Sequence, residues 1–322
     1  MSTAVVSPAH HPSARLRAAG AALAALGGVA LAVQGRINGQ LGHQLQDGVV
    51  AALISFSVGS VLLLAVAPIL PGARAGVGRL RKALREQALR PWQMLGGACG
   101  AFLVTTQGVT VQLLGVAVFT VAVVAGQVVC SLPVDRAGLG PGGPQPITLP
   151  RAVGASLAVI AVIISVSDQG IVTASGGLWW AALPAVAGAG LAWQGAMNGR
   201  VRAAADDVVV PTVVNFLVGT CALVLAACVD VIIKGWPATP PDQWYLYVGG
   251  TLGIVAIMTA VSAVRVTGVL LLGMASVTGQ LVGAVLLDIF VPTTGGLSVT
   301  TVVGIALTMV AVGIAAIRRR PR

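Results

Sequence analysis

Charged residues are scarce in this chain. Only 9% of its residues are Asp, Glu, Lys or Arg, whereas a soluble domain carries about 25%. Hydrophobic residues make up 57% of the sequence. Since so few polar side chains cannot cover a water-facing surface, lipid must solvate much of the exterior. The composition therefore excludes an ordinary soluble domain and predicts an integral membrane protein.

Acidic and metal-binding groups are also few. The one glutamate, Glu86, lies in a basic loop, and no carboxylate falls in the middle of an apolar run. This pattern argues against a proton-coupled cation exporter built on a buried acid. The four cysteines lie in apolar runs without zinc-type spacing, which favours simple packing. We therefore expect no metal site.

Signatures of enzymes and of nucleic-acid binding are missing too. The sequence has no nucleophile–base pair, and its glycine-rich segment 138–150 lacks the Gly-Lys-Ser/Thr ending of a phosphate loop. The net charge of +10 comes from basic residues confined to loops and the C-terminal tail, without stacking aromatics. We expect no enzymatic activity, no cofactor and no nucleic-acid partner.

An internal repeat is the strongest positive feature. Residues 34–60 match residues 194–220, at an offset of 160, with 10 of 27 positions identical. Residues 96–135 match residues 249–288, at an offset of 153, with 13 of 40 identical. Because both copies are very apolar, the repeat indicates a duplicated membrane unit.

Ten apolar stretches are long enough, at about 17–25 residues, to cross a bilayer as helices. They predict a first five-helix repeat at 18–167 and a second at 177–317, between a disordered cytoplasmic segment at 1–17 and a basic cytoplasmic tail at 318–322. The stretches are 18–37, 49–70, 93–111, 115–134, 151–167, 177–197, 208–232, 245–264, 268–288 and 299–317.

The basic residues indicate the orientation of these spans. With the N-terminus in the cytoplasm, 17 Lys and Arg residues fall on the inner side and only two, Arg36 and Lys234, on the outer side. Cytoplasmic loops carry such an excess. The distribution predicts that both termini face the cytoplasm, in a bacterial inner membrane.

Each copy has an odd number of spans, so the second copy would enter the membrane from the opposite side. The predicted fold is therefore an all-α integral membrane protein with ten transmembrane helices in two inverted five-helix repeats. Secondary transporters use this arrangement to expose one central site alternately to either side. The alternative is two copies fused only for packing.

Amide side chains inside the spans are the candidates for a solute path. A polar group is energetically costly inside lipid, so its presence there suggests a function. Gln127 and Gln280 lie near the middles of the fourth and ninth spans, and we predict that they contact the solute. Hydrogen bonding between helices is the alternative. Gln34, Asn38, Gln194 and Asn198 are candidates for a polar gate or part of the path, with a simple clamp or cap as the alternative. Asn215 is a further candidate for the path, as a residue that could line a cavity.

Asp135 and Asp288 end the fourth and ninth spans, each eight residues, or about 12 Å, beyond its glutamine. We expect them near opposite interfaces. Each is either a solvated or Arg-paired terminal carboxylate, with Arg136 beside Asp135, or a gating or proton-coupling group.

Several glycines are predicted to let helices approach closely, because small residues four apart do so in lipid. They are Gly96, Gly100, Gly249, Gly253, Gly126, Gly279 and Gly283.

Three motifs occur twice: Gln-Gly-x-x-Asn-Gly, then Ser/Asn-Phe-x-Val-Gly-Ser/Thr, then Ala/Thr-Gly-Gln-Val/Leu-Val followed by Asp. They stand at Gln34–Gly39, Ser55–Ser60 and Ala125–Asp135, and at Gln194–Gly199, Asn215–Thr220 and Thr278–Asp288. In these motifs the chain resembles the YdcZ-like branch of the drug/metabolite transporter (DMT) superfamily, in a fused two-unit form. The resemblance implies two antiparallel five-helix units around a central cavity, and export of small metabolites or drugs. The chain departs from the pattern at Arg36, which matches Ala196 in the second copy.

We therefore expect an inner-membrane secondary transporter that exports a small organic metabolite or drug-like solute by alternating access. A lipid or lipid-linked flippase is one alternative. A non-transporting membrane scaffold or partner subunit is another. The expected partners are the lipid bilayer and the small-molecule solute, and both a monomer and a homodimer stay open.

Overall fold

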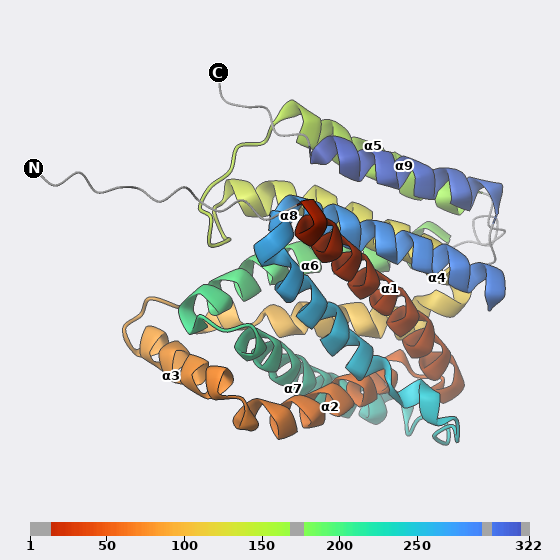
Figure 1. The fold of residues 1–322 in the computed structure, drawn as a ribbon. Coiled ribbons are helices and arrows are strands. Elements are labelled where there is room, and N and C mark those ends of the chain that lie inside the picture. Colours follow the sequence, from red (N-terminus) through yellow and green to blue (C-terminus); the bar gives the residue numbers. More distant parts are fainter. Residues whose placement is uncertain (1–13, 168–176, 292–297, 317–322) are drawn as a thin grey trace, which may run out of the picture.

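The chain folds into a bundle of helices (Figure 1). The computed structural model describes residues 14–167, 177–291 and 298–316, with all their side chains except those of Arg17, 177–179, 260–261 and 264–271. No strand occurs in these ranges. The helices are α1 (Ala14–Leu45), α2 (Gly48–Val66), α3 (Pro71–Arg85), α4 (Gly96–Arg136), α5 (Leu149–Ser167), α6 (Gly177–Ala205), α7 (Val209–Lys234), α8 (Gly249–Phe290) and α9 (Val299–Ala315), with short 3-10 turns at Ala67–Ile69, Pro91–Met94 and Trp244–Tyr247.

The structure describes only part of the two ends of the chain. Of the segment 1–17 that the sequence predicts to be disordered, residues 1–13 lie outside the described ranges, and α1 already begins at Ala14. The predicted basic tail at 318–322 also lies outside them.

Six helical segments of the described residues are long and apolar enough to cross a bilayer. They are Ala14–Leu45, Gly48–Ile69, Pro91–Arg136, Leu149–Ser167, Val209–Lys234 and Leu272–Phe290. The predicted all-α membrane class is therefore confirmed. The number of ten crossings stays a prediction, because two pairs of predicted spans have merged into single long helices.

The merged helix α4 shows how such a pair is joined. The helix has 41 residues, which at 1.5 Å per residue would extend about 60 Å, twice the thickness of a bilayer core. It is interrupted at Gly115, whose φ of 78° and ψ of 160° are not helical. This backbone conformation is nearly exclusive to glycine. A break at one residue thus replaces the loop expected near 112–114, and Figure 1 shows the two arms running along different lines.

Matched residues of the two sequence copies make matched contacts between helices. A Cβ atom at Gly28 of α1 would overlap the carbonyl oxygen of Ser276 in α8. A Cβ atom at Gly188 of α6 would overlap the carbonyl oxygen of Val123 in α4. The offsets between these residues are the 160 and 153 of the sequence repeat. Only glycine allows helix backbones to come this close.

The glycines predicted to pack also face other helices. At each of the seven positions, atoms of another helix lie within 4 Å of where a Cβ would stand. Gly126 meets Ala185, and its counterpart Gly279 meets Ala25. In each of the two helix pairs, α6 with α4 and α1 with α8, both helices therefore contribute a glycine to the contact.

Helices α2 and α7 meet through counterpart residues. The ring centroids of Phe56 and Phe216 are 5.1 Å apart. The hydroxyl oxygens of Ser60 and Thr220 lie 2.8 Å apart. Each pair is separated by 160 residues in the sequence, so the two copies face each other residue for residue at this crossing.

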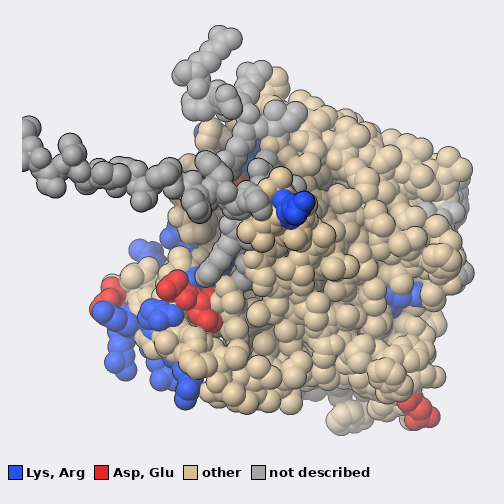
Figure 2. Space-filling model, viewed as in Figure 1, with Lys and Arg blue, Asp and Glu red and all other residues tan. Residues whose placement is uncertain are grey.

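Most of the outer surface is apolar. Leu225 of α7 is 70% exposed and Ile232 is 83% exposed, which suits side chains that face lipid. Figure 2 shows a largely uncharged face, with most of the visible Lys and Arg gathered over the end where α3 lies.

We expect Gly188→Ala to lower the free energy of unfolding by about 1–3 kcal/mol, because the added methyl group must push α6 away from α4. Gly195→Ala in the same helix is the matched control, since nothing lies within 4 Å of an added Cβ there. Thermal unfolding of the two purified variants in detergent measures the difference. Equal midpoints would contradict the close approach of α6 to α4.

Candidate functional site

Two amides of α1 face the beginning of α8. Gln34 and Asn38 lie on one face of α1 because a four-residue spacing returns to the same side of a helix. Both are buried. Gln34 lies beside Gly253, and Asn38 lies with Ser55 of α2 beside Gly249. We call Gln34, Asn38 and Ser55 the first amide cluster.

A second amide cluster faces the beginning of α4. It consists of Gln194 and Asn198 from α6 and Asn215 from α7. Gln194 lies beside Gly100, and Asn198 and Asn215 lie beside Gly96. Gln194 and Asn215 are buried, and Asn198 is half-buried. Each member is the repeat counterpart of a member of the first cluster.

Five buried side-chain oxygens in the two clusters accept no hydrogen bond from the described residues. They are Gln34 Oε1, Asn38 Oδ1, Ser55 Oγ, Gln194 Oε1 and Asn215 Oδ1. A buried acceptor without a partner costs about 1–3 kcal/mol. The glycines opposite make no hydrogen bond to these oxygens. A solute with O–H or N–H groups would therefore be favoured at both clusters.

Gln107 of α4 joins the first amide cluster. Its Oε1 accepts a hydrogen bond of 2.7 Å from Asn38 Nδ2, and both side chains are buried. The sequence analysis missed Gln107, because its counterpart in the second copy is Ala260 and comparison of the copies passes over it. The available signal was an amide within an apolar run.

A small, largely enclosed cavity of about 30 Å³ lies between α1, α4, α6 and α8. It has room for one or two water molecules and not for an organic solute. Gln107 and Gln280 contribute amides to its wall, and Thr120 contributes a hydroxyl. The other lining residues are Leu31, Ala32, Gly35, Leu103, Val116, Phe119, Val123 and Leu191. The wall is thus uncharged and comes from both sequence copies.

The glutamine pair that the sequence predicts at the centre is divided in the structure. Gln280 lines the cavity, whereas Gln127 does not. Gln127 is half-buried in the second arm of α4, and its backbone lies beside Gly188. A larger, open hollow of about 520 Å³ lies at the surface, formed by residues within 43–46 and 239–243. None of the predicted path residues lines it.

Asp288 is buried at the end of α8 and caps the second arm of α4. Its Oδ1 accepts a hydrogen bond of 3.1 Å from the Val116 amide, and its Oδ2 accepts one of 2.8 Å from the Ala117 amide. These amides directly follow the break at Gly115. The first N–H groups of the second arm have no hydrogen-bond acceptor within the helix. A carboxylate also suits the positive end of a helix. A solvated end for Asp288 is therefore wrong, because the carboxylate fastens α8 to α4.

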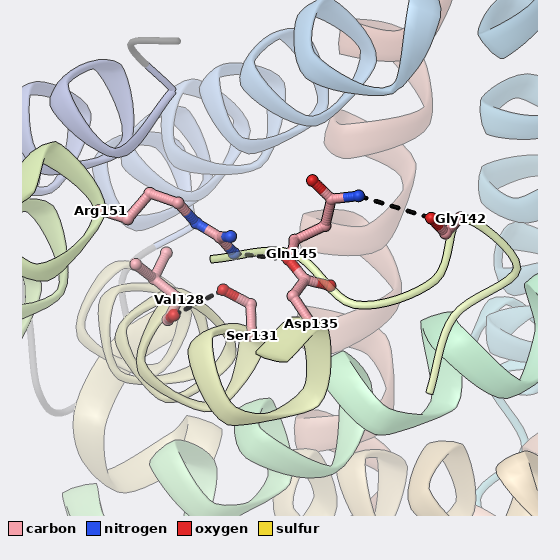
Figure 3. Close-up of polar contacts among 6 residues, drawn as sticks. All are labelled: Val128, Ser131, Asp135, Gly142, Gln145 and Arg151. Carbon is pink, nitrogen blue, oxygen red and sulfur yellow. Dashed lines mark hydrogen bonds and ion pairs between the residues drawn. The ribbon is translucent and has the colours of Figure 1, made fainter. Parts of the chain in front are cut away.

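Asp135, the counterpart of Asp288, has different surroundings (Figure 3). Its carboxylate forms an ion pair with Arg151 at the beginning of α5, with side-chain exposures of 41% and 20%. The backbone amide of Gln145 donates to the Asp135 carbonyl at 2.8 Å. The partner is thus Arg151, across the loop, and not the neighbouring Arg136. The two counterpart aspartates make different contacts.

The site offers hydrogen bonding to a solute. Among the described residues, no group of three or more His, Cys, Asp or Glu side chains could hold a metal ion. Two amides and a hydroxyl, from α4 and α8, line an uncharged space, and such groups can donate hydrogen bonds to a polar molecule and accept them from it.

One family model matches the chain twice. Its description is "Putative inner membrane exporter, YdcZ", and the matches cover residues 19–164 and 179–314. The division between them falls where the sequence repeat divides the chain. No curated protein matches the chain.

We expect Asp288→Ala to lower the free energy of unfolding by about 1–3 kcal/mol, because two buried amides would lose their acceptor. Asp135→Ala removes a partly exposed ion pair and should cost less than about 1 kcal/mol. Thermal unfolding in detergent compares the two variants. A loss in Asp135→Ala as large as that in Asp288→Ala would argue against the cap on α4.

Proposed function

Because the chain belongs to the YdcZ family of inner membrane exporters, we propose that it exports a small organic solute by alternating access between two antiparallel five-helix units. One observation carries the proposal. Each sequence copy contributes an amide cluster that lies against the glycine-rich beginning of a helix from the other copy. A small cavity with an amide-bearing wall lies between the four helices that carry these contacts.

In this proposal the helices make ten crossings. α4 and α8 have 41 and 42 residues, and each would cross twice, since one crossing needs about 20. The helices α1, α2, α5, α6, α7 and α9 would cross once each, and α3 would lie at the inner surface. Five crossings per copy make the copies antiparallel. The uneven distribution of basic residues then favours cytoplasmic termini.

The two amide clusters would act as the gates of the passage. Gln107, which contacts the first cluster, lies 11 residues beyond Gly96, which faces the second. That spacing corresponds to about 16 Å along α4, so the clusters lie at different depths. Opening the first would connect the cavity to the outside, and opening the second would connect it to the cytoplasm. Closure of both corresponds to an occluded form.

The chemistry of the wall favours a solute with hydrogen-bond donors and apolar surface. The lining residues carry no charge, and the unpartnered oxygens in the clusters can all accept hydrogen bonds. Hydroxyl or amino groups on the solute would satisfy these acceptors, while Phe119 and Leu103 would contact its apolar part. The cavity reaches Gln280. A solute passage requires such a cavity, whereas a fully packed scaffold would not need one.

Accessibility of the cavity tests alternating access without knowledge of the solute. A cysteine is placed at the cavity wall by Gly35→Cys, in a chain whose native cysteines are changed to alanine. One disulfide lock combines Ser55→Cys with Gly249→Cys, at the first cluster. The matched lock combines Asn215→Cys with Gly96→Cys, at the second. Labelling by a membrane-impermeant maleimide is measured from each side of sealed vesicles.

We expect labelling from both sides without a lock, because each gate opens in turn. The first lock should abolish labelling from the outer side only, and the second lock from the inner side only, each reversibly on reduction. Labelling from neither side in the unlocked chain would favour a packed scaffold. Labelling from both sides despite one lock would rule out these clusters as gates.

We expect Gln280→Ala to lower the rate of solute flux on the order of tenfold, the effect of losing about one hydrogen bond to the solute. Gln127→Ala is the matched control, because its side chain does not line the cavity, and its flux should stay within about twofold of the parent. Flux of labelled candidate solutes into proteoliposomes measures both. Equal losses in the two variants would place the contact elsewhere.

A further inference from the structure

Helix α3 has no counterpart in the second copy. It is a 15-residue helix, Pro71–Arg85, in the connection between α2 and α4. The corresponding connection between α7 and α8, residues 235–248, contains only a short 3-10 turn and no Lys or Arg. Whatever α3 does is therefore specific to one end of the molecule.

One face of α3 packs on the second copy. Leu80 is buried with Val201 and Ala205 of α6. The Arg79 guanidinium donates hydrogen bonds to the carbonyl of Ala205 at 2.7 Å and to that of Asp206 at 3.2 Å. These contacts hold α3 against the end of α6, the helix that carries Gln194 and Asn198.

Another face of α3, which is exposed, carries a stripe of arginines. Arg74, Arg81 and Arg85 follow one another at spacings of seven and four residues, which places them on one line along the helix. All three are exposed. Lys82 lies beside the stripe and pairs with Glu86 at 3.8 Å, where both side chains are exposed. No acidic residue lies on the stripe itself.

Apolar residues on both sides of α3 place it at the edge of the lipid layer. Ile69, just before α3, is 74% exposed and ends an apolar span. Trp92 and Leu95, after α3, are 40% and 50% exposed at the beginning of the next span. Since these side chains must face lipid, α3 lies at the level of the head groups. Figure 2 shows the basic residues gathered at this end of the molecule.

We propose that the arginine stripe of α3 (Arg74, Arg81 and Arg85) binds the anionic phospholipid head groups of the surrounding bilayer. A basic helix at the membrane surface is attracted to anionic lipid. Guanidinium groups also match phosphate oxygens in pairs of hydrogen bonds. Through Arg79 the bound lipids would hold the end of α6, beside the second amide cluster. The interaction does not depend on which solute is carried.

A fluorescent probe in the stripe tests the proposal. Gly78 lies between Arg74 and Arg81, is exposed, and has nothing within 4 Å of an added Cβ. The full chain, with native cysteines changed to alanine, receives Gly78→Cys and a fluorophore at that position. It is reconstituted in phosphatidylcholine vesicles containing a small share of brominated lipid. Quenching by brominated phosphatidylglycerol is compared with quenching by brominated phosphatidylcholine.

We expect phosphatidylglycerol to quench at least about twofold more than phosphatidylcholine, because it is enriched around a basic surface. The preference should fall in high salt. It should disappear in the triple variant Arg74→Gln, Arg81→Gln, Arg85→Gln. The matched control, Arg318→Gln, Arg319→Gln, Arg320→Gln, loses the same charge elsewhere and should keep the preference.

Equal quenching by the two lipids in the unmutated stripe would overturn the proposal without recourse to any variant. A preference that survives the triple variant, or that the tail variant removes to the same extent, would overturn it as well. The triple variant changes only exposed side chains, and its elution as a single species in detergent confirms that it is folded.

Discussion

Direct contact between helix backbones is the constraint on which the rest of this structure depends. Inside lipid, helices gain little from burying more apolar surface, so close packing at small residues must hold them together. Gly28 lets the backbone of α1 pack directly against α8, and Gly188 lets the backbone of α6 pack directly against α4. These two contacts carry the amides of α1 and α6 to the glycine-rich beginnings of α8 and α4, where the side chains of the site lie.

The two copies share their geometry but differ in chemistry. Asn38 has Gln107 as a hydrogen-bond partner, while the counterpart of Gln107 is Ala260. Asp288 is buried and fastens two helices, whereas Asp135 forms an ion pair near the surface. If the two clusters act as the proposed gates, these differences would let them open with unequal ease.

Comparison of the copies singled out most of the polar residues in the two amide clusters but not Gln107. Gln34, Asn38, Gln194 and Asn198 stand out because the two copies keep the same amide at matched positions, and Asn215 stands where the first copy has Ser55. Gln107 escaped notice for the opposite reason, since its importance comes from a contact that the second copy lacks. Gln127 and Gln280 are a matched pair in the sequence, yet only Gln280 lines the cavity. The packing of each glutamine depends on its neighbours, which the repeat does not preserve.

Composition and spacing alone determined that this chain lies in a membrane and that it is built from a repeated helical unit, and they predict that its arginines gather at one side. These properties follow from local facts, the length of apolar runs and the position of charges, which no tertiary contact can change. Only the tertiary structure decided which amide faces which glycine, and that Asp288 caps a helix 172 residues away. That cap requires the break at Gly115 in α4, which brings distant residues together and which neither segment reveals by itself.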